Sequence, residues 1–154
     1  LLVFGFVFWQ DSYWMASTTP ASYFMGAQTQ QSYLENTLGY YIRAMETLQT
    51  LPEDQRILML WEPRGLYAPL NAQADLWIDR WRTDQRELLN APAILQRWKD
   101  QGFTYLLVYQ QGVELIRPQP GQAPSASWLE FQNLLTKLPA PTDIGGQYQL
   151  YKLQ

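Results

Sequence analysis

Hydrophobic and polar positions follow one another along the chain in blocks that predict alternating helices and strands. From Tyr33 to Leu48 the apolar residues recur at spacings of three, four and one, which is typical of an amphipathic helix. Pro52 lies just beyond its predicted end. Gly39 is a weak point within it, where the helix can divide into two.

Short apolar runs predict the strands. Arg56–Trp61 is almost continuously apolar, as expected of a strand covered on both faces. Phe103–Tyr109 has the aromatic and aliphatic composition of a second core strand. Between them, Ala74–Asp79 is predicted as a further strand, and the alternation in Tyr148–Leu153 indicates an edge strand with one wet face.

Two more helices and a loop complete the pattern. Asn90 precedes Ala-Pro and is predicted to cap a helix that closes at Gly102, with Ile94, Leu95 and Trp98 on its buried face. A second amphipathic helix is predicted for Trp128–Leu138. Residues 66–71 are expected to form a short helical turn, and Arg117–Ser127 has the proline, glycine and serine content of a loop.

In chain order these elements predict an α/β fold. The expected architecture is a small three-layer Rossmann-like sandwich, with a mostly parallel sheet of about four strands. The C-terminal strand is expected to run antiparallel to the others, at the edge of the sheet. With 154 residues, 47% of them hydrophobic, the chain is long enough for one domain with a sizeable core.

The N-terminal segment differs from the rest. Leu1–Trp9 is uninterrupted apolar sequence, shorter than the about 20 residues with which a helix crosses a bilayer. It fits either the end of a membrane helix with aromatic residues at the interface or a buried strand. Ser17–Gln31 has the composition of a surface connector. We therefore expect a fragment of a larger protein, with a membrane-proximal segment and connector in residues 1–32 and a soluble α/β domain in residues 33–154.

Composition narrows the chemistry. The net charge is −3 with scattered Lys and Arg, so no nucleic-acid partner is expected. The absence of Cys and His removes disulfides, thiol nucleophiles, Ser-His-Asp triads and the usual zinc and non-haem iron ligands. We predict no catalytic residue, metal site or cofactor in this fragment, and an enzymatic activity of its own is unsupported.

The turn after the first core strand contains the candidate site. Glu62, Arg64 and Tyr67 follow the carboxyl end of that strand, where open α/β sheets place their ligands. Arg64 and Tyr67 are suited to an anionic or sugar ligand. A surface ion pair between Glu62 and Arg64 is the alternative. The turn has a single glycine and a proline, which disfavours a phosphate-cradling dinucleotide loop.

A pair of aspartates and a set of three tryptophans each have a functional and a simpler structural interpretation. Asp75 and Asp79 lie four residues apart, a spacing that brings two carboxylates together in a strand or a helix. Without a third ligand, solvated charge is favoured over a metal site. Trp77, Trp81 and Trp98 have rings that can stack on sugars, but core positions are favoured for all three.

Several short sequences carry a resemblance to a known family. They are Tyr33-Leu34, Gly39-Tyr40, Leu51-Pro52-Glu53-Asp54, Ile57 to Trp61, Glu62-Pro63-Arg64-Gly65-Leu66-Tyr67, Gly102-Phe103-Thr104-Tyr105-Leu106-Leu107-Val108 and the closing Gly145 to Leu153. Over residues 30–154 the chain resembles the C-terminal soluble domains of bacterial polytopic membrane glycosyltransferases. These are of the GT-C type, related to dolichyl-phosphate-mannose protein mannosyltransferases and to the lipid A aminoarabinose transferase.

The resemblance implies a role that depends on a missing part. In proteins of that kind, membrane helices use a polyprenyl-phosphate sugar donor, and the catalytic acidic residue lies in an extracytoplasmic loop near the N-terminus, so no catalytic residue carries over. It implies a non-catalytic accessory domain at the cell membrane, on the extracytoplasmic side. Its partners would be the membrane part of the parent chain and a lipid-linked sugar or acceptor. A free-standing small-molecule-binding domain and a subunit-interaction domain remain the alternatives.

Overall fold

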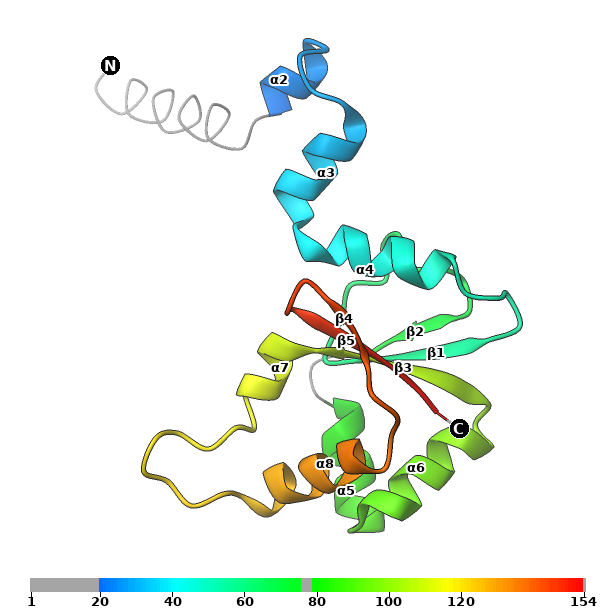
Figure 1. Ribbon diagram of the computed structural model, residues 1–154, viewed down its shortest axis with the longest axis vertical. Helices are drawn as coiled ribbons and strands as arrows, with labels where there is room; N and C mark the ends of the chain where they lie inside the picture. Colours follow the sequence, from blue (N-terminus) through cyan, green and yellow to red (C-terminus); the bar gives the residue numbers. More distant parts are fainter. Residues whose placement is uncertain (1–19, 76–78, 154) are drawn as a thin grey trace, which may run out of the picture. The chain divides into compact units, whose positions relative to one another are not determined.

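The computed structural model describes residues 20–75 and 79–153 (Figure 1). The chain forms two compact units, Leu1–Arg43 and Ala44–Gln154, so their boundary falls inside one helix, α4 (Tyr40–Gln49). The predicted division into a membrane-proximal part, residues 1–32, and a soluble part, residues 33–154, stays a prediction. Leu1–Trp9, to which the membrane-helix and buried-strand interpretations apply, lies outside the described residues.

The second unit is built on a mixed five-stranded sheet with the order β2-β1-β3-β5-β4. Its strands are β1 (Arg56–Leu60), β2 (Ala72–Ala74), β3 (Phe103–Tyr109), β4 (Thr142–Ile144) and β5 (Tyr148–Lys152). Strand β1 pairs in parallel with β2 and β3, whereas β5 runs antiparallel to both β3 and β4. The predicted α/β class and the antiparallel C-terminal strand are confirmed.

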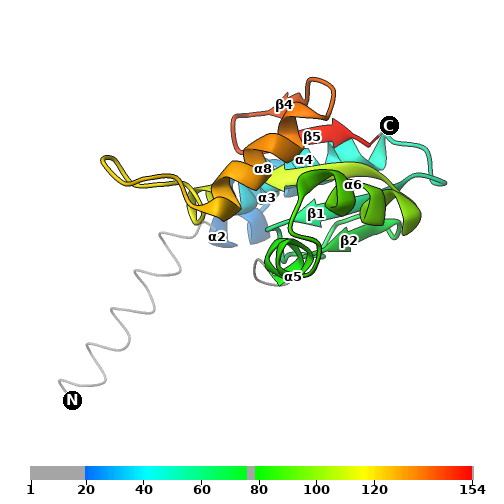
Figure 2. The same ribbon diagram turned by 90° about the horizontal axis from the view of Figure 1, so that it is seen from below.

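Helices α5 (Asp79–Leu88), α6 (Ala91–Asp100) and α8 (Ala126–Thr136) lie on one side of this sheet (Figures 1 and 2). The predicted cap of α6 is confirmed, because Asn90 Oδ1 accepts a hydrogen bond from the amide of Ala93 at 2.9 Å. Ser125 caps α8 in the same way, and this helix begins two residues earlier than Trp128, where the apolar stripe predicted it.

The core between these helices and the sheet is aromatic. Trp61, Trp81 and Phe131 pack edge to face, with ring centroids between 4.8 and 6.5 Å apart. Strand residues of one alternating set, among them Leu58, Leu60, Leu106 and Val108, form the floor of this cluster. Trp81 and Trp98 are fully buried, which confirms their interpretation as core residues, and Trp77 lies outside the described residues.

The second predicted strand is shifted. Strand β2 occupies Ala72–Ala74, and residues 76–78 of the predicted strand Ala74–Asp79 lie outside the described residues. Asp79 begins α5, a helix that the sequence did not predict. Helix α5 is dominated by polar residues, so its sequence has no apolar stripe. Its start is instead supported by a tertiary contact, because Asp75 Oδ1 accepts a hydrogen bond from the amide of Arg80 at 3.2 Å.

The predicted edge position of the C-terminal strand is wrong. Strand β4, which is too short to show an alternating pattern, pairs with β5 and lies beyond it, so the sheet has five strands and β5 is internal. Gly145 and Gly146 join the two strands with φ angles of 62° and 70°, a left-handed conformation that glycine adopts without strain.

A smaller expectation also fails. Residues 66–71 form turns rather than a helical turn, with the amide of Ala68 bonded to the carbonyl of Gly65. Directly after β3, Gln110-Gln111-Gly112 belongs to the short helix α7 (Gln110–Glu114). Gly112 packs so closely on Trp61 that a Cβ atom there would lie 2.2 Å from the Trp61 Cβ, which explains the glycine.

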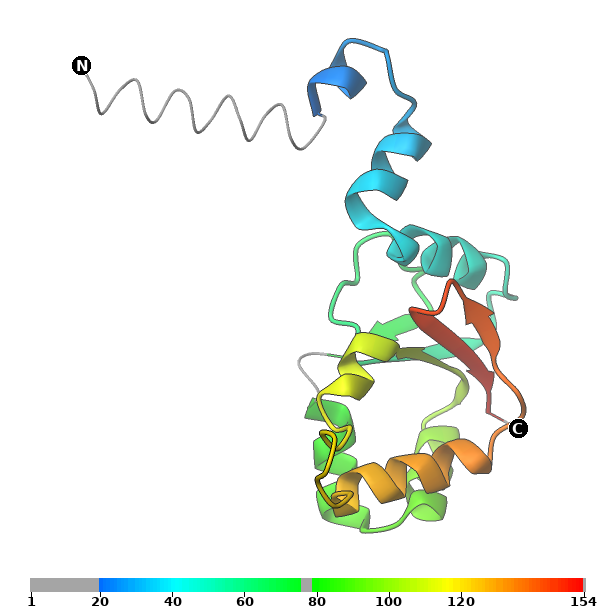
Figure 3. The same ribbon diagram turned by 60° about the vertical axis from the view of Figure 1, so that its left-hand side comes forward.

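In the first unit the structure describes two short helices before α4 (Figure 3). Helix α2 (Pro20–Phe24) lies within the predicted connector, and α3 (Gln30–Leu38) begins where Thr29 caps it by accepting a hydrogen bond from the amide of Ser32. Gly39 separates α3 from α4 with a φ of 57°, which confirms it as the break point. No helix within residues 20–75 and 79–153 is long and apolar enough to span a bilayer.

Candidate functional site

A buried carboxylate stands at the carboxyl end of β1. Glu62 is 0% exposed, and each of its oxygens accepts two hydrogen bonds. Oε1 accepts from the amide of Arg64 at 3.0 Å and from its Nε at 2.8 Å. Oε2 accepts from Arg64 Nη2 at 2.8 Å and from the Tyr148 hydroxyl at 2.5 Å. We call Glu62, Arg64, Tyr109 and Tyr148 the edge cluster.

The chain direction at Trp61 brings Glu62 to this position. Trp61 has a φ of 62°, a left-handed conformation that is unusual for a bulky residue. The turn is held on both sides by Asp75. Its Oδ2 accepts a hydrogen bond from the amide of Trp61 at 3.1 Å, and its own amide donates to the carbonyl of Glu62, also at 3.1 Å.

The two tyrosines come from neighbouring strands. Tyr109 ends β3 and Tyr148 begins β5, and the two residues are paired across the sheet. Their rings stack with centroids 4.9 Å apart at an angle of 21°. Because β5 runs antiparallel to β3, its first residue lies at the carboxyl end of β3, the same edge at which β1 ends. The Arg64 guanidinium carbon lies 5.9 Å from the centre of the Tyr109 ring, within reach of a cation–π interaction.

The edge cluster is an ion-pair network around a buried carboxylate. A buried carboxylate is costly unless it is paired and fully hydrogen-bonded, and Glu62 meets both conditions. The hydrogen bond from Arg64 to Glu62 is the main reason that the pKa of Arg64 is raised, and burial acts in the opposite direction. Burial raises the pKa of Tyr148, and its hydrogen bond to Glu62 raises it further. At neutral pH the tyrosine is therefore a neutral donor and the arginine a cation.

Solvent reaches this network from the Arg64 side. The Arg64 side chain is 42% exposed while that of Glu62 is completely buried. The predicted pair of Glu62 and Arg64 is thus an ion pair, with one member at the surface and the other in the interior. What the edge cluster presents to a ligand is the outer face of an immobilised guanidinium, a group suited to a carboxylate or phosphate.

The structure brings Glu62 and Arg64 together but leaves Tyr67 outside the edge cluster. Tyr67 is exposed on the following loop, and its carbonyl accepts a hydrogen bond from Gln49 Nε2 at 3.1 Å. Sequence reasoning missed Tyr109 and Tyr148. The sequence contained a signal for Tyr148. It is the first residue of the C-terminal strand, and an antiparallel strand begins at the edge of the sheet where the parallel strands end and Glu62 lies.

The other candidate carboxylate has a structural role. Asp75 is buried and accepts hydrogen bonds from the amides of Trp61 and Arg80, so it is not solvated charge as the sequence favoured. The side chain of Asp79 lies outside the described structure. Among residues 20–75 and 79–153, no group of three or more His, Cys, Asp or Glu side chains could hold a metal ion.

A third buried carboxylate joins helices α5 and α6. Asp84 accepts hydrogen bonds from Arg80 Nε at 2.7 Å, Arg97 Nη1 at 2.9 Å and Trp98 Nε1 at 2.6 Å. Burial acts to raise the pKa of Asp84, but the hydrogen bonds from Trp98, Arg97 and Arg80 outweigh it and the pKa is lowered. The three donors come from both helices, so the group acts as a link between them.

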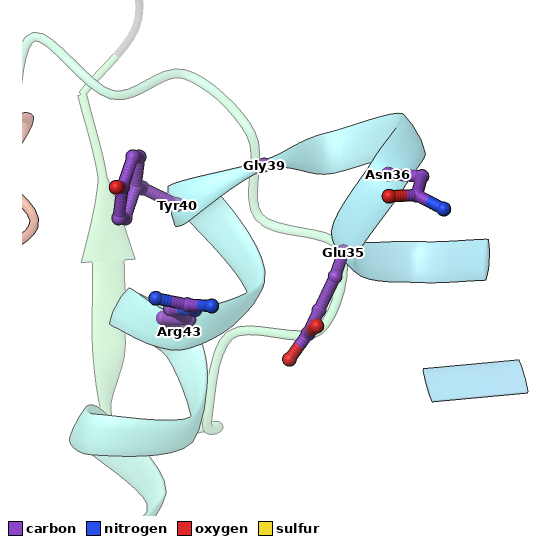
Figure 4. Close-up of a pocket in the computed structure, with 5 residues that line it drawn as sticks. All are labelled: Glu35, Asn36, Gly39, Tyr40 and Arg43. Atoms are coloured by element: carbon purple, nitrogen blue, oxygen red, sulfur yellow. The ribbon is translucent and has the colours of Figure 1, made fainter. Parts of the chain in front are cut away.

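The first unit contains a small polar pocket of about 190 Å³ around the break between α3 and α4 (Figure 4). It is lined by Glu35, Asn36, Gly39, Tyr40 and Arg43. Arg43 lies over the Tyr40 ring, with its guanidinium carbon 5.3 Å from the ring centre. Figure 4 shows this pair on one side of Gly39 and the Glu35 and Asn36 side chains on the other.

Comparison with protein-family models, with curated proteins and with solved structures finds no match to this chain.

Proposed function

We propose that this chain is a non-catalytic accessory domain of a membrane glycosyltransferase that takes sugar from a polyprenyl-phosphate donor on the extracytoplasmic side. One observation carries the proposal: the segments with the family resemblance are those that build the edge cluster and the strands beside it. Glu62 and Arg64 come from Glu62–Tyr67, Tyr148 comes from the closing Gly-Gly motif, and Tyr109 directly follows Gly102–Val108.

The hydrogen bonding of Glu62 supports an accessory rather than a catalytic role. A general acid or base must exchange a proton with substrate at hydrogen-bond distance. Both oxygens of this carboxylate already accept hydrogen bonds from Arg64 and Tyr148 inside the protein. The edge cluster therefore serves to hold the ends of β1, β3 and β5 in place, and it keeps this surface rigid for contact with the membrane part of the parent chain.

We also propose that the fold is a three-layer Rossmann-like arrangement. The parallel neighbours β2-β1-β3 follow the order that begins the flavodoxin-like type of doubly wound sheet, which supports it. The connection from β1 to β2 departs from that type, since residues 66–71 form turns where a crossover helix would stand.

The first test is the sequence upstream of Leu1 in the gene. Several apolar segments of about 20 residues, with an acidic residue in the first external loop, would support the proposal. An upstream region without such segments would contradict it, because no membrane catalytic unit would then be attached.

A second test uses the parent enzyme. Glu62→Gln should reduce the yield of folded enzyme but leave the pH dependence of sugar transfer in the folded fraction unchanged, because Glu62 holds structure and moves no proton. Glu114→Gln, at an exposed carboxylate, is the matched control for the loss of one charge. Folded Glu62→Gln enzyme without any transfer activity would make Glu62 catalytic and overturn the proposal.

The exposed face of Arg64 favours a second candidate, a binding site for a small anionic molecule. The guanidinium is pre-oriented by Glu62 and Tyr148 at the carboxyl edge of the sheet, where α/β proteins place ligands. Titration with inorganic phosphate, followed by amide NMR shifts, should then perturb the residues around Arg64. Arg64→Ala should abolish the shifts, and shifts that survive this change would remove Arg64 from the site.

A subunit-interaction role is the third possibility. Leu66, Tyr67 and Leu70 are exposed together on the loop that follows the edge cluster. Beside Leu70 is a cavity of about 440 Å³ that is lined in part by Leu48, Leu51 and Pro69. Such a role predicts self-association or binding to the parent chain that weakens in Tyr67→Ser, whereas a monomer with no affinity for the parent would exclude it.

A further inference from the structure

The C-terminal end of α2 and the residue after it display two large apolar side chains to solvent. Phe24 is 83% exposed and Met25 is 77% exposed, and they are consecutive in the chain. Isolated exposed apolar residues are ordinary, but adjacent ones at the tip of a structured turn require an explanation. We call Phe24 and Met25 the apolar tip.

The turn beneath the apolar tip is held firmly. Gly26 has a φ of 72°, its amide donates to the carbonyl of Tyr23 at 3.0 Å, and the amide of Ala27 donates to the carbonyl of Ser22 at 2.9 Å. This is the hydrogen-bond pattern of a Schellman motif, which closes the end of a helix. Phe24 and Met25 therefore lie on a terminated helix end and not on an irregular connector.

Side chains also join α2 to α3 behind the apolar tip. Ser22 Oγ donates to Gln28 Oε1 at 3.0 Å, and Gln28 Nε2 donates to Ser32 Oγ at 3.1 Å. The rings of Tyr23 and Tyr33 stack with centroids 5.1 Å apart. Helices α2 and α3 form a helical hairpin, and these contacts between them fix its conformation. Phe24 and Met25 are therefore exposed before any binding event.

The surrounding sequence indicates what the apolar tip meets. Between Asp11 and Glu35 the chain contains no charged residue, although it contains three tyrosines, a tryptophan, a phenylalanine and two methionines. Trp and Tyr side chains are enriched at the boundary between lipid and water. The wholly apolar run Leu1–Trp9 precedes this segment in the same chain.

We propose that Phe24 and Met25 insert into the interfacial layer of a lipid bilayer and hold the α2–α3 hairpin at the membrane surface. This inference rests on the membrane association within the proposed function. It adds the contact residues and the lipid chemistry: because the segment lacks charge, the contact depends on apolar burial and not on anionic headgroups.

The absence of cysteine from the sequence allows a direct test with single labels. Met25→Cys, carrying an environment-sensitive fluorophore, is compared with Leu129→Cys, an exposed apolar position in the second unit. On phosphatidylcholine vesicles the Met25 probe should shift to the blue and be quenched by lipids brominated on their chains. The Leu129 probe should show neither effect. Vesicles with added phosphatidylglycerol should give the same result to within about twofold in partitioning.

The paired variant is Phe24→Ser with Met25→Ser, matched by Leu115→Ser with Leu129→Ser, which removes two exposed leucines elsewhere. The first pair should lower vesicle partitioning by about tenfold or more and the second should leave it unchanged. Circular dichroism should show both to be folded, because all four side chains are exposed.

Flotation of the full chain with vesicles separates the possible failures. Flotation without a shift of the Met25 probe would overturn the inference and leave membrane association standing. A chain that does not float at all would count against both the inference and the membrane association. A shift of the Met25 probe that appears without vesicles when the protein concentration is raised would identify a second copy of the chain as the partner and overturn the lipid contact. A shift that appears only with anionic lipid would overturn the inference that the contact depends on apolar burial.

Discussion

The Tyr148 hydroxyl donates a hydrogen bond of 2.5 Å to Oε2 of Glu62, a residue 86 positions earlier in the chain. The contact joins the start of β5 to the end of β1 across β3, which lies between them in the sheet. It is the longest-range contact of the edge cluster, and it gives a buried carboxylate a donor that Arg64 alone does not supply. Its removal is therefore the most direct test of the cluster.

Tyr148→Phe should destabilise the protein by about 1.5–3 kcal/mol, the usual contribution of a hydrogen bond to a charged group. The ring and its stacking on Tyr109 are retained, so the loss reports the hydroxyl alone. Urea unfolding measures it. Tyr151→Phe is the control, because that hydroxyl donates to the neutral amide oxygen of Gln149, and a smaller loss of about 1 kcal/mol is expected. Equal losses would contradict the special position of Tyr148.

Arg64→Ala should cost about 2 kcal/mol, between the values for exposed and buried ion pairs because the arginine is partly in solvent. Most of the loss comes from leaving the Glu62 carboxylate without its cation. The double variant Glu62→Gln with Arg64→Ala should therefore lose less than the sum of the two single variants, and a thermodynamic cycle of urea unfolding measures the coupling. Strict additivity would show that the pair contributes nothing.

Stability in acid should depend on Asp84. Its pKa in the folded protein lies below the ordinary value of 3.8, so the unfolded chain binds a proton more readily. The stabilisation is present above pH 3.8 and is lost as the pH falls through the lower folded pKa. Unfolding free energies measured from pH 6 down to about pH 2 should fall less steeply in Asp84→Asn than in the unchanged chain. Parallel curves would mean that Asp84 is not the group responsible.

Stability in alkali should depend on Tyr148. Its pKa in the folded protein lies above the ordinary 10.0, so its contribution is present below pH 10.0 and is lost as the pH rises through the folded pKa. Burial also raises the pKa of Tyr151, so tyrosinate absorbance at equilibrium should show fewer tyrosines titrating near pH 10.0 in the folded chain than in urea. The difference should be smaller in Tyr148→Phe than in Tyr67→Phe, an exposed position that serves as the control.

Gly112→Ala should destabilise the protein by about 1–3 kcal/mol, because the added methyl group enters space already filled by Trp61. Thermal unfolding measures the loss, and near-ultraviolet circular dichroism should report a disturbed Trp61 environment. Gly65→Ala is the control, since a Cβ atom there meets nothing within 4 Å. A neutral Gly112→Ala would show that α7 moves to make room at no cost.

The elements that the sequence determined are those whose apolar pattern is complete within the element itself. Strands β1 and β3 are continuous apolar runs, α6 has its own cap at Asn90, and α3 and α4 divide at Gly39, so local chemistry is sufficient for each. The Glu62–Arg64 turn was likewise recognisable, because it directly follows a strand. The apolar and uncharged character of the N-terminal segment is also a property of sequence alone.

The tertiary structure decided the elements that depend on distant partners. Helix α5 has few apolar residues and is held by Asp75 and Asp84, and β4 is a three-residue strand that exists by pairing with β5. The edge cluster is of the same kind, since the antiparallel return of β5 brings Tyr148 to Glu62. Hydrogen bonds and strand pairings between residues that are far apart in the chain produce no periodic pattern in the sequence. Each is formed by residues that approach one another only when the sheet is assembled.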